Sequence, residues 1–104
     1  MNQEILTRIK TILNVDESKM TVISELARIQ YEALLARLNQ EVIGTELEFI
    51  VVETTIARYN RLGSEGLSSE GIDVIKQDFQ EDLFAPYTSM IAEYNKKHRK
   101  AKFV

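Results

Sequence analysis

The stretch that decides the fold is TELEFIVVETTIARYNRLG, residues 45–63. Its apolar positions are not confined to one helical face, which is typical of a helix surrounded by partners. Thr45 and Glu48 have the spacing of a capping box, and Gly63 follows where a left-handed C-terminal cap favours glycine. The β-branched run at 50–52 is also compatible with a strand. We predict a helix ending just before the glycine, because roughly five turns exceed the length of an ordinary strand.

Two further helices are predicted before this stretch. The first is short, amphipathic and ends near Asn14, since isoleucines recur at helical spacing: Ile5, Ile9 and Ile12. The second is long, can be capped by Asp16 or Ser18, and should stop at Gly44. Its apolar stripe has the same periodicity: Ile23, Ala27, Tyr31, Leu34 and Leu38.

A glycine- and serine-rich loop follows the central helix at residues 63–71. It fits a mobile contact arm and an ordinary surface loop equally well, and few apolar side chains are present to hold it. The alternating Ile72-Asp73-Val74 predicts a small strand or hairpin element over residues 72–75. A last amphipathic helix should begin between Asp82 and Pro86, because proline is tolerated in a first turn. The predicted fold class is therefore all-α, with about four helices and that small element between the third and fourth.

The chain has 104 residues, of which 44% are apolar, enough for one domain with its own core and too few for two. It has no cysteine and one histidine, His98, so disulfides, thiolate nucleophiles and the usual imidazole metal cluster are nearly excluded. Carboxylate pairs such as Glu46 and Glu48 fit solvated helix starts far better than catalysis. We predict no catalytic, cofactor-binding or metal-binding residue.

No segment has the features of a targeting or membrane sequence. The N-terminus reads MNQE, without the basic and apolar regions of a secretory signal, and no run approaches the roughly 18 apolar residues of a membrane span. We expect a soluble protein made in the cytoplasm.

The net charge of −3 conceals an asymmetry. Residues 1–95, the predicted helical domain, carry 8 basic and 16 acidic side chains, or −8, whereas residues 96–104 form a basic tail with five cations and no acid. An acidic body repels phosphate backbones, so attraction to nucleic acid would have to come from the tail. The tail itself is compatible with a frayed helix end or with a strap that docks on an acidic surface.

The segment VVETTIARYNRLGSEGLSSE, Val51 to Glu70, resembles the phage head-tail connector, or adaptor, family of tailed phages and prophages, particularly the versions from Gram-positive hosts. The order of helices and the basic tail follow the same family pattern. At the end of the chain such proteins tend to have a Tyr-Arg-basic run, where this one has Tyr94-Asn95-Lys96-Lys97. The resemblance implies a structural virion protein without catalysis, whose copies form a ring of about a dozen subunits under the portal and extend the DNA channel.

The implied partners are other copies of the chain, the portal protein and the next connector or tail-completion protein. DNA would pass through the channel without specific binding, and no membrane is involved. The implied location is the virion, after synthesis in the cytoplasm of the host bacterium. Candidate subunit or portal contacts are Arg58, Tyr59, Arg61, Ser64, Glu65, Leu67, Lys96, Lys97, Arg99 and Lys100.

Alternatives remain at several of these positions. Tyr59 fits an interface anchor or a core tyrosine, and Arg58 and Arg61 fit either helix-dipole caps or ion pairs between subunits. From a different class, the chain could be a small helical binding or regulatory module, such as a helix-turn-helix DNA binder. That function needs a basic recognition helix, and none of the four predicted helices is basic.

Overall fold

The computed structural model describes residues 1–64 and 82–98, and all regular elements among them are helical. They are α1 (Gln3–Leu13), α2 (Met20–Leu38), α3 (Glu48–Ser64) and α5 (Thr88–Lys97), with short 3-10 turns at Glu17–Lys19, Thr45–Leu47 and Ala85–Tyr87. Within these residues the prediction of an all-α fold with about four helices is confirmed. No strand is found in the described part of the chain, and the element predicted at residues 72–75 lies outside it, as does most of the glycine-rich loop.

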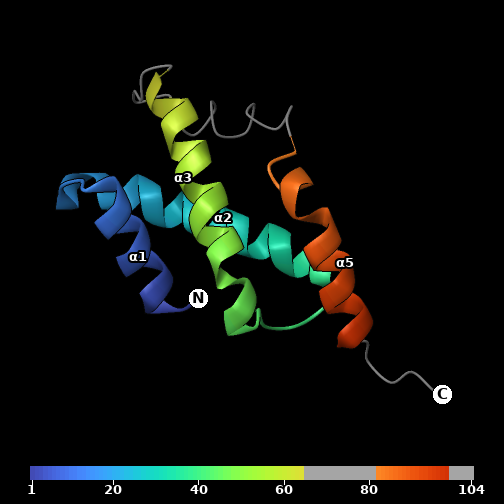
Figure 1. The fold of residues 1–104 in the computed structure, drawn as a ribbon. Coiled ribbons are helices and arrows are strands. Elements are labelled where there is room, and N and C mark those ends of the chain that lie inside the picture. Colours follow the sequence, from blue (N-terminus) through green and yellow to red (C-terminus); the bar gives the residue numbers. More distant parts are fainter. Residues whose placement is uncertain (65–81, 99–104) are drawn as a thin grey trace.

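Helix α3 stands in the middle of the domain, with α1 on one side, α5 on the other and α2 crossing behind it (Figure 1). The run at 50–52 is helical and at most 2% exposed. Along α3 the exposed positions are confined to one narrow stripe, Glu53, Ala57 and Asn60. The prediction of a helix enclosed on more than one face is therefore confirmed, because the neighbouring helices cover the rest of its surface.

Asparagines define both ends of α1. The Asn2 side chain accepts a hydrogen bond from the Glu4 backbone N–H at 2.8 Å, which is an N-cap. At the other end Asn14 adopts a left-handed conformation (φ 53°), and its N–H donates to the Lys10 carbonyl at 2.8 Å. The predicted end of this helix near Asn14 is confirmed.

The predicted limits of α2 are wrong at both ends. Neither Asp16 nor Ser18 makes a side-chain cap; a 3-10 turn with Asp16 before it leads straight into the helix. The helix ends at Leu38, well before Gly44, because Asn39 takes the left-handed conformation (φ 55°) and donates its N–H to the Leu35 carbonyl at 2.9 Å. Asparagine tolerates this conformation better than other non-glycine residues, so it can end a helix as glycine does.

The capping box predicted at the start of α3 is also wrong. Thr45 lies inside the 3-10 turn, whose N-cap is Gly44 without a side-chain hydrogen bond, so its hydroxyl is not in capping position. Glu48 is buried, and its Oε2 accepts a hydrogen bond from Asn2 Nδ2 at 3.1 Å. At the other end α3 continues through Gly63 to Ser64, two residues beyond the predicted end.

Helix α5 begins at Thr88, two residues beyond the predicted window, and only the 3-10 turn before it starts inside that window. Pro86 lies in the 3-10 turn Ala85–Tyr87 that leads into α5, where a missing N–H costs nothing. Phe84 and Ile91 anchor this segment on the main core, at 4% and 7% exposed.

Truncating Ile50 and Ile56 to alanine tests the enclosure of α3. Ile50 is fully buried, so Ile50→Ala should lower the free energy of unfolding by about 2–5 kcal/mol. Ile56 is on the same helix but half-buried, so Ile56→Ala should cost distinctly less and serves as the control. Urea unfolding of both variants measures the difference. Equal losses would contradict the burial described.

Candidate functional site

The residues predicted as contacts lie on α3, on α5 and outside the described residues. Within residues 1–64 and 82–98 no group of three or more His, Asp or Glu side chains is arranged to hold a metal ion. Over the same residues, no helix combines the length and the apolar character needed to cross a bilayer.

Among the predicted contact residues on α3, Arg58 is enclosed within the chain. It is 1% exposed, and its Nη1 donates a hydrogen bond to Oε1 of the buried Gln30 on α2 at 2.8 Å. A buried guanidinium is costly unless hydrogen-bonded, so this bond fixes the two helices relative to each other. In the single chain Arg58 belongs to the packing of α2 on α3, and a contact with another subunit would require it to be uncovered.

The other predicted residues of this region are more accessible or lie elsewhere. Tyr59 and Arg61 are half-buried. Tyr59 packs both against the main hydrophobic core, which includes Ile50, and against a smaller cluster formed by Leu26 and Leu62. Ser64 is the last residue of α3. Glu65 and Leu67 are outside the described residues, as are Arg99 and Lys100. Their predicted roles as contacts stay predictions.

Lys96 and Lys97 are exposed in the last turn of α5, where cations complement the helix dipole. This end of the helix is held by two polar contacts, one to α2 and one between the residues that follow the two helices. Asn95 Nδ2 donates to the Arg37 carbonyl at 3.0 Å, and Gln40 Nε2 donates to the His98 carbonyl at 2.9 Å. The predicted basic tail therefore begins inside a helix whose position is fixed.

His98 is exposed but contacts two side chains, Tyr94 and Glu46. Its ring stacks on Tyr94, with centroids 4.2 Å apart and an interplanar angle of 26°. Its Nε2 lies 3.9 Å from Oε2 of Glu46 in the turn before α3. The sequence pattern missed this contact because Glu46 is distant in the chain.

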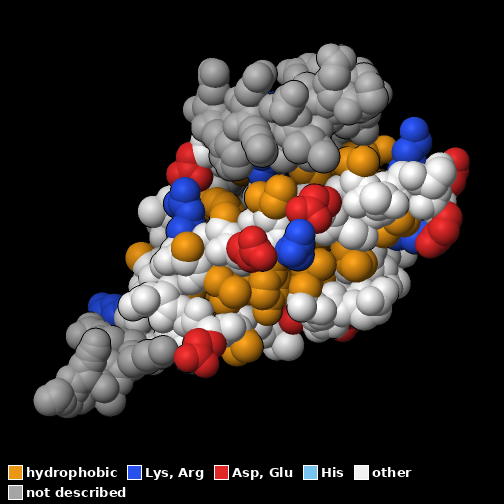
Figure 2. Space-filling model, turned by 180° about the vertical axis from the view of Figure 1, so that it is seen from behind, with side chains coloured by type: hydrophobic (Ala, Val, Ile, Leu, Met, Phe, Trp, Pro, Cys, Tyr) orange, Lys and Arg blue, Asp and Glu red, His pale blue; other side chains and the backbone are white. Residues whose placement is uncertain are grey.

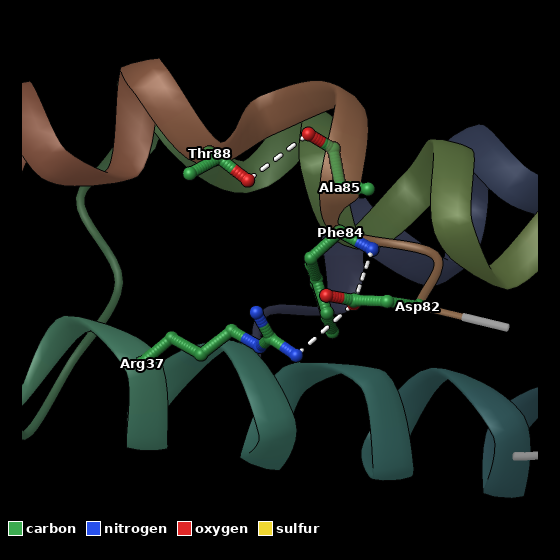
Figure 3. Close-up of polar contacts among 5 residues, drawn as sticks. All are labelled: Arg37, Asp82, Phe84, Ala85 and Thr88. Carbon is green, nitrogen blue, oxygen red and sulfur yellow. Dashed lines mark hydrogen bonds and ion pairs between the residues drawn. The ribbon is translucent and has the colours of Figure 1, made fainter. Parts of the chain in front are cut away.

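Arg37, near the end of α2, organises the entry into α5 (Figure 3). Its Nη2 lies 3.0 Å from Asp82 Oδ1, and the same oxygen accepts the Phe84 backbone N–H at 3.0 Å. The guanidinium carbon lies 4.8 Å from the centre of the Phe84 ring, a cation–π arrangement. One carboxylate thus shapes the turn and binds it to α2. Asp82 marked the start of this segment in the sequence, but nothing there identified Arg37 as its partner.

A hollow of about 250 Å³ lies between the turn before α3 and α5. Leu47, Met90 and Tyr94 supply its apolar lining, and Glu46, Glu93, Lys97 and His98 complete it. Gly44 allows the chain to pass close to this hollow, since a Cβ there would stand 2.7 Å from Tyr94 Oη and 2.6 Å from Glu46 Oε1. The sequence singled out Gly44 as a helix end, whereas in the structure it lies beside the ends of two side chains, Glu46 and Tyr94, which would have to shift to admit a Cβ.

Tyr87 joins the start of α5 to α3. Its hydroxyl donates a short hydrogen bond to Glu53 Oε1, and its ring meets Phe49 edge to face at 5.9 Å. The hydrogen bond to the Glu53 carboxylate raises the pKa of Tyr87 to about 12, with smaller contributions from burial and from the carboxylate's charge. The neutral phenol is therefore favoured in the folded protein.

A family model described as phage gp6-like head-tail connector protein matches residues 3–95, which run from the start of α1 almost to the end of α5. No curated protein and no solved structure matches the chain.

The Tyr87 hydroxyl predicts a pH dependence of stability. Because its pKa is raised from the ordinary value near 10 to about 12, its contribution is complete below the lower value and is lost as pH rises through the upper one. Tyr87→Phe should be less stable than the parent at neutral pH, and the difference should shrink across this alkaline window. Urea unfolding at several pH values measures it. Tyr31→Phe, which leaves Glu53 untouched, is the control. A difference that does not change with pH would contradict the hydrogen bond to Glu53.

Proposed function

The chain belongs to the phage gp6-like head-tail connector family, and on this premise we propose that its copies form a ring beneath the portal, extend the DNA channel and join head to tail. The family is one of structural virion proteins, not of enzymes. The observation that carries the proposal is the extent of the match, which covers residues 3–95, from the start of α1 almost to the end of α5. The similarity to versions from Gram-positive hosts rests on the sequence alone and stays a prediction, as does synthesis in the host cytoplasm.

Charge supports a role in which DNA passes without being held. Residues 1–95 carry −8, and a surface of this sign repels phosphates within a Debye length, about 8 Å at physiological salt. Figure 2 shows acidic and basic side chains interspersed among apolar ones on one face of the domain, without a broad basic patch in the part that is coloured. A channel wall of this kind favours sliding over binding.

The DNA-binding alternative receives little support from the described helices. A helix that reads the major groove carries cations for the phosphates beside it. Helix α2 is the longest, and its Arg28 and Arg37 are offset by Glu25 and Glu32, with Arg28 paired to Glu25 at 2.9 Å. Specific duplex recognition is therefore the weaker proposal.

The basic tail is proposed to dock on an acidic surface of the adjoining ring, which is either the portal or the next connector. Lys96 and Lys97 project into solvent from the end of α5, and the sequence continues with Arg99, Lys100 and Lys102. Asn95 of α5 donates to the Arg37 carbonyl of α2, and Gln40, just after α2, donates to the His98 carbonyl. The first cations are therefore presented from a fixed position. Such a contact gains strength at low ionic strength and loses it as salt screens the charges.

Neutralising the tail tests this docking. Changing Lys96, Lys97, Arg99, Lys100 and Lys102 to glutamine should preserve the fold, because the backbone contact of His98 with Gln40 is retained. Binding of this variant to the portal encoded with the chain is measured by co-sedimentation. It should be weaker than that of the parent at low salt and should lose most of its dependence on salt concentration. Lys19→Gln with Arg28→Gln removes exposed body cations as the control.

Duplex DNA in the same assay distinguishes the two functions. The connector proposal predicts no tight binding of DNA by the parent chain at physiological salt. Tight DNA binding that disappears in the tail variant, together with unchanged portal binding, would overturn the proposed partner of the tail.

A further inference from the structure

The apolar stripe of α1 continues beyond its partners. Ile5 and Ile9 are fully buried, and Ile12 lies on nearly the same side of the helix because seven residues are close to two turns. Yet Ile12 is 61% exposed, whereas the other two are at 0%. A branched aliphatic side chain on the core-facing stripe thus projects from the end of α1 without a partner that covers it.

The hollow beside α5 has complementary properties. It measures about 250 Å³, and Leu47, Met90 and Tyr94 supply its apolar lining. A cavity of about 150 Å³ already accepts a molecule of the size of benzene, so the hollow has room for an isoleucine side chain. Met90 is 43% exposed at its edge. The hollow is therefore an apolar surface that the chain itself leaves open.

The two features cannot meet within one subunit. Helices α1 and α5 lie on opposite sides of the domain, separated by α2 and α3 (Figure 1). We propose that Ile12 of one copy inserts into the Leu47–Met90–Tyr94 hollow of the next copy. Two different surfaces then meet in each contact, which is a head-to-tail interface, and such interfaces close into rings when the rotation allows. This inference rests on the proposed ring and assigns the surfaces that build it.

Charges around the two features support the same pairing. Arg8 is exposed one turn before Ile12, while Lys10 is already engaged by Glu17. The hollow carries Glu93 and Glu46, together with Lys97 and His98. Arg8 has its complement in Glu93, because Glu46 already faces His98 at 3.9 Å. Opposite charges of this kind fix the orientation of an apolar contact.

Cysteine cross-linking tests the contact, since the chain has no cysteine of its own. Ile12→Cys and Met90→Cys place one thiol on each of two chains, at exposed positions whose substitution spares the core. The two variants are mixed under mild oxidation, once in concentrated solution and once on the portal. We expect the mixed 12–90 disulfide to form several-fold more than from Thr7→Cys with Ser89→Cys, the control pair on the same two helices. Mass spectrometry identifies the linked peptides.

A charge exchange provides the second variant set. Arg8→Glu alone and Glu93→Arg alone should each reduce the 12–90 yield several-fold, and the two changes together should restore it. A 12–90 yield no higher than that of the control pair in both conditions overturns the interface, even if the chain binds the portal. A high 12–90 yield in solution combined with no portal binding leaves the interface standing and contradicts the proposed function.

Discussion

Enclosure of α3 is the constraint on which the rest of the structure depends. A helix buried on several faces removes polar groups from water along with the apolar ones, and each needs a partner. Glu48 is bonded to Asn2 before α1, and Arg58 is bonded to Gln30 of α2. The Thr54 hydroxyl donates a hydrogen bond to the Ile50 carbonyl, one turn earlier in α3, at 2.7 Å. Apolar burial thus supplies the driving force for packing α1 and α2 on α3, and the bonds of Glu48 and Arg58 fix their positions, while that of Thr54 stays within α3.

Helix α5 is attached by different means. Its contacts with α2 and α3 combine a few apolar anchors with polar bonds at or near the surface, among them those of Arg37, Tyr87 and Asn95. Partly exposed ion pairs contribute little stability, typically below about 1 kcal/mol each. Their effect is chiefly geometric, because they set the direction in which α5 presents the hollow and the first lysines of the tail. The surfaces proposed for assembly lie on this helix and on the free end of α1, away from the enclosed core.

The sequence predicted what depends on periodicity and missed what depends on contacts between distant residues. The presence of the helices and the enclosure of α3 follow from the spacing of apolar residues. The position of Pro86 before the last helix follows from proline's missing N–H donor. The boundaries at Gly44 and Thr45 failed because Asn39 adopted the left-handed conformation first and a 3-10 turn displaced the capping residue. From the sequence Arg58 fitted a helix-dipole cap or an ion pair between subunits, and neither interpretation anticipated its buried hydrogen bond to Gln30.

The candidate site was predictable to a similar degree. The family resemblance was visible in residues 51–70 and is confirmed by the match over residues 3–95. The exposed lysines of α5 follow from composition. The hollow does not, because it lies between the turn before α3 and α5, which are distant in the sequence. Exposure of Ile12 was likewise hidden, since its spacing is that of a buried residue.

Electron cryomicroscopy of the chain bound to its portal tests the connector function most directly. The expected map shows a closed ring coaxial with the portal, wide enough to pass duplex DNA, in which α1 of each copy meets α5 of its neighbour. Single copies scattered on the outside of the portal, or a ring off its axis, would contradict that function.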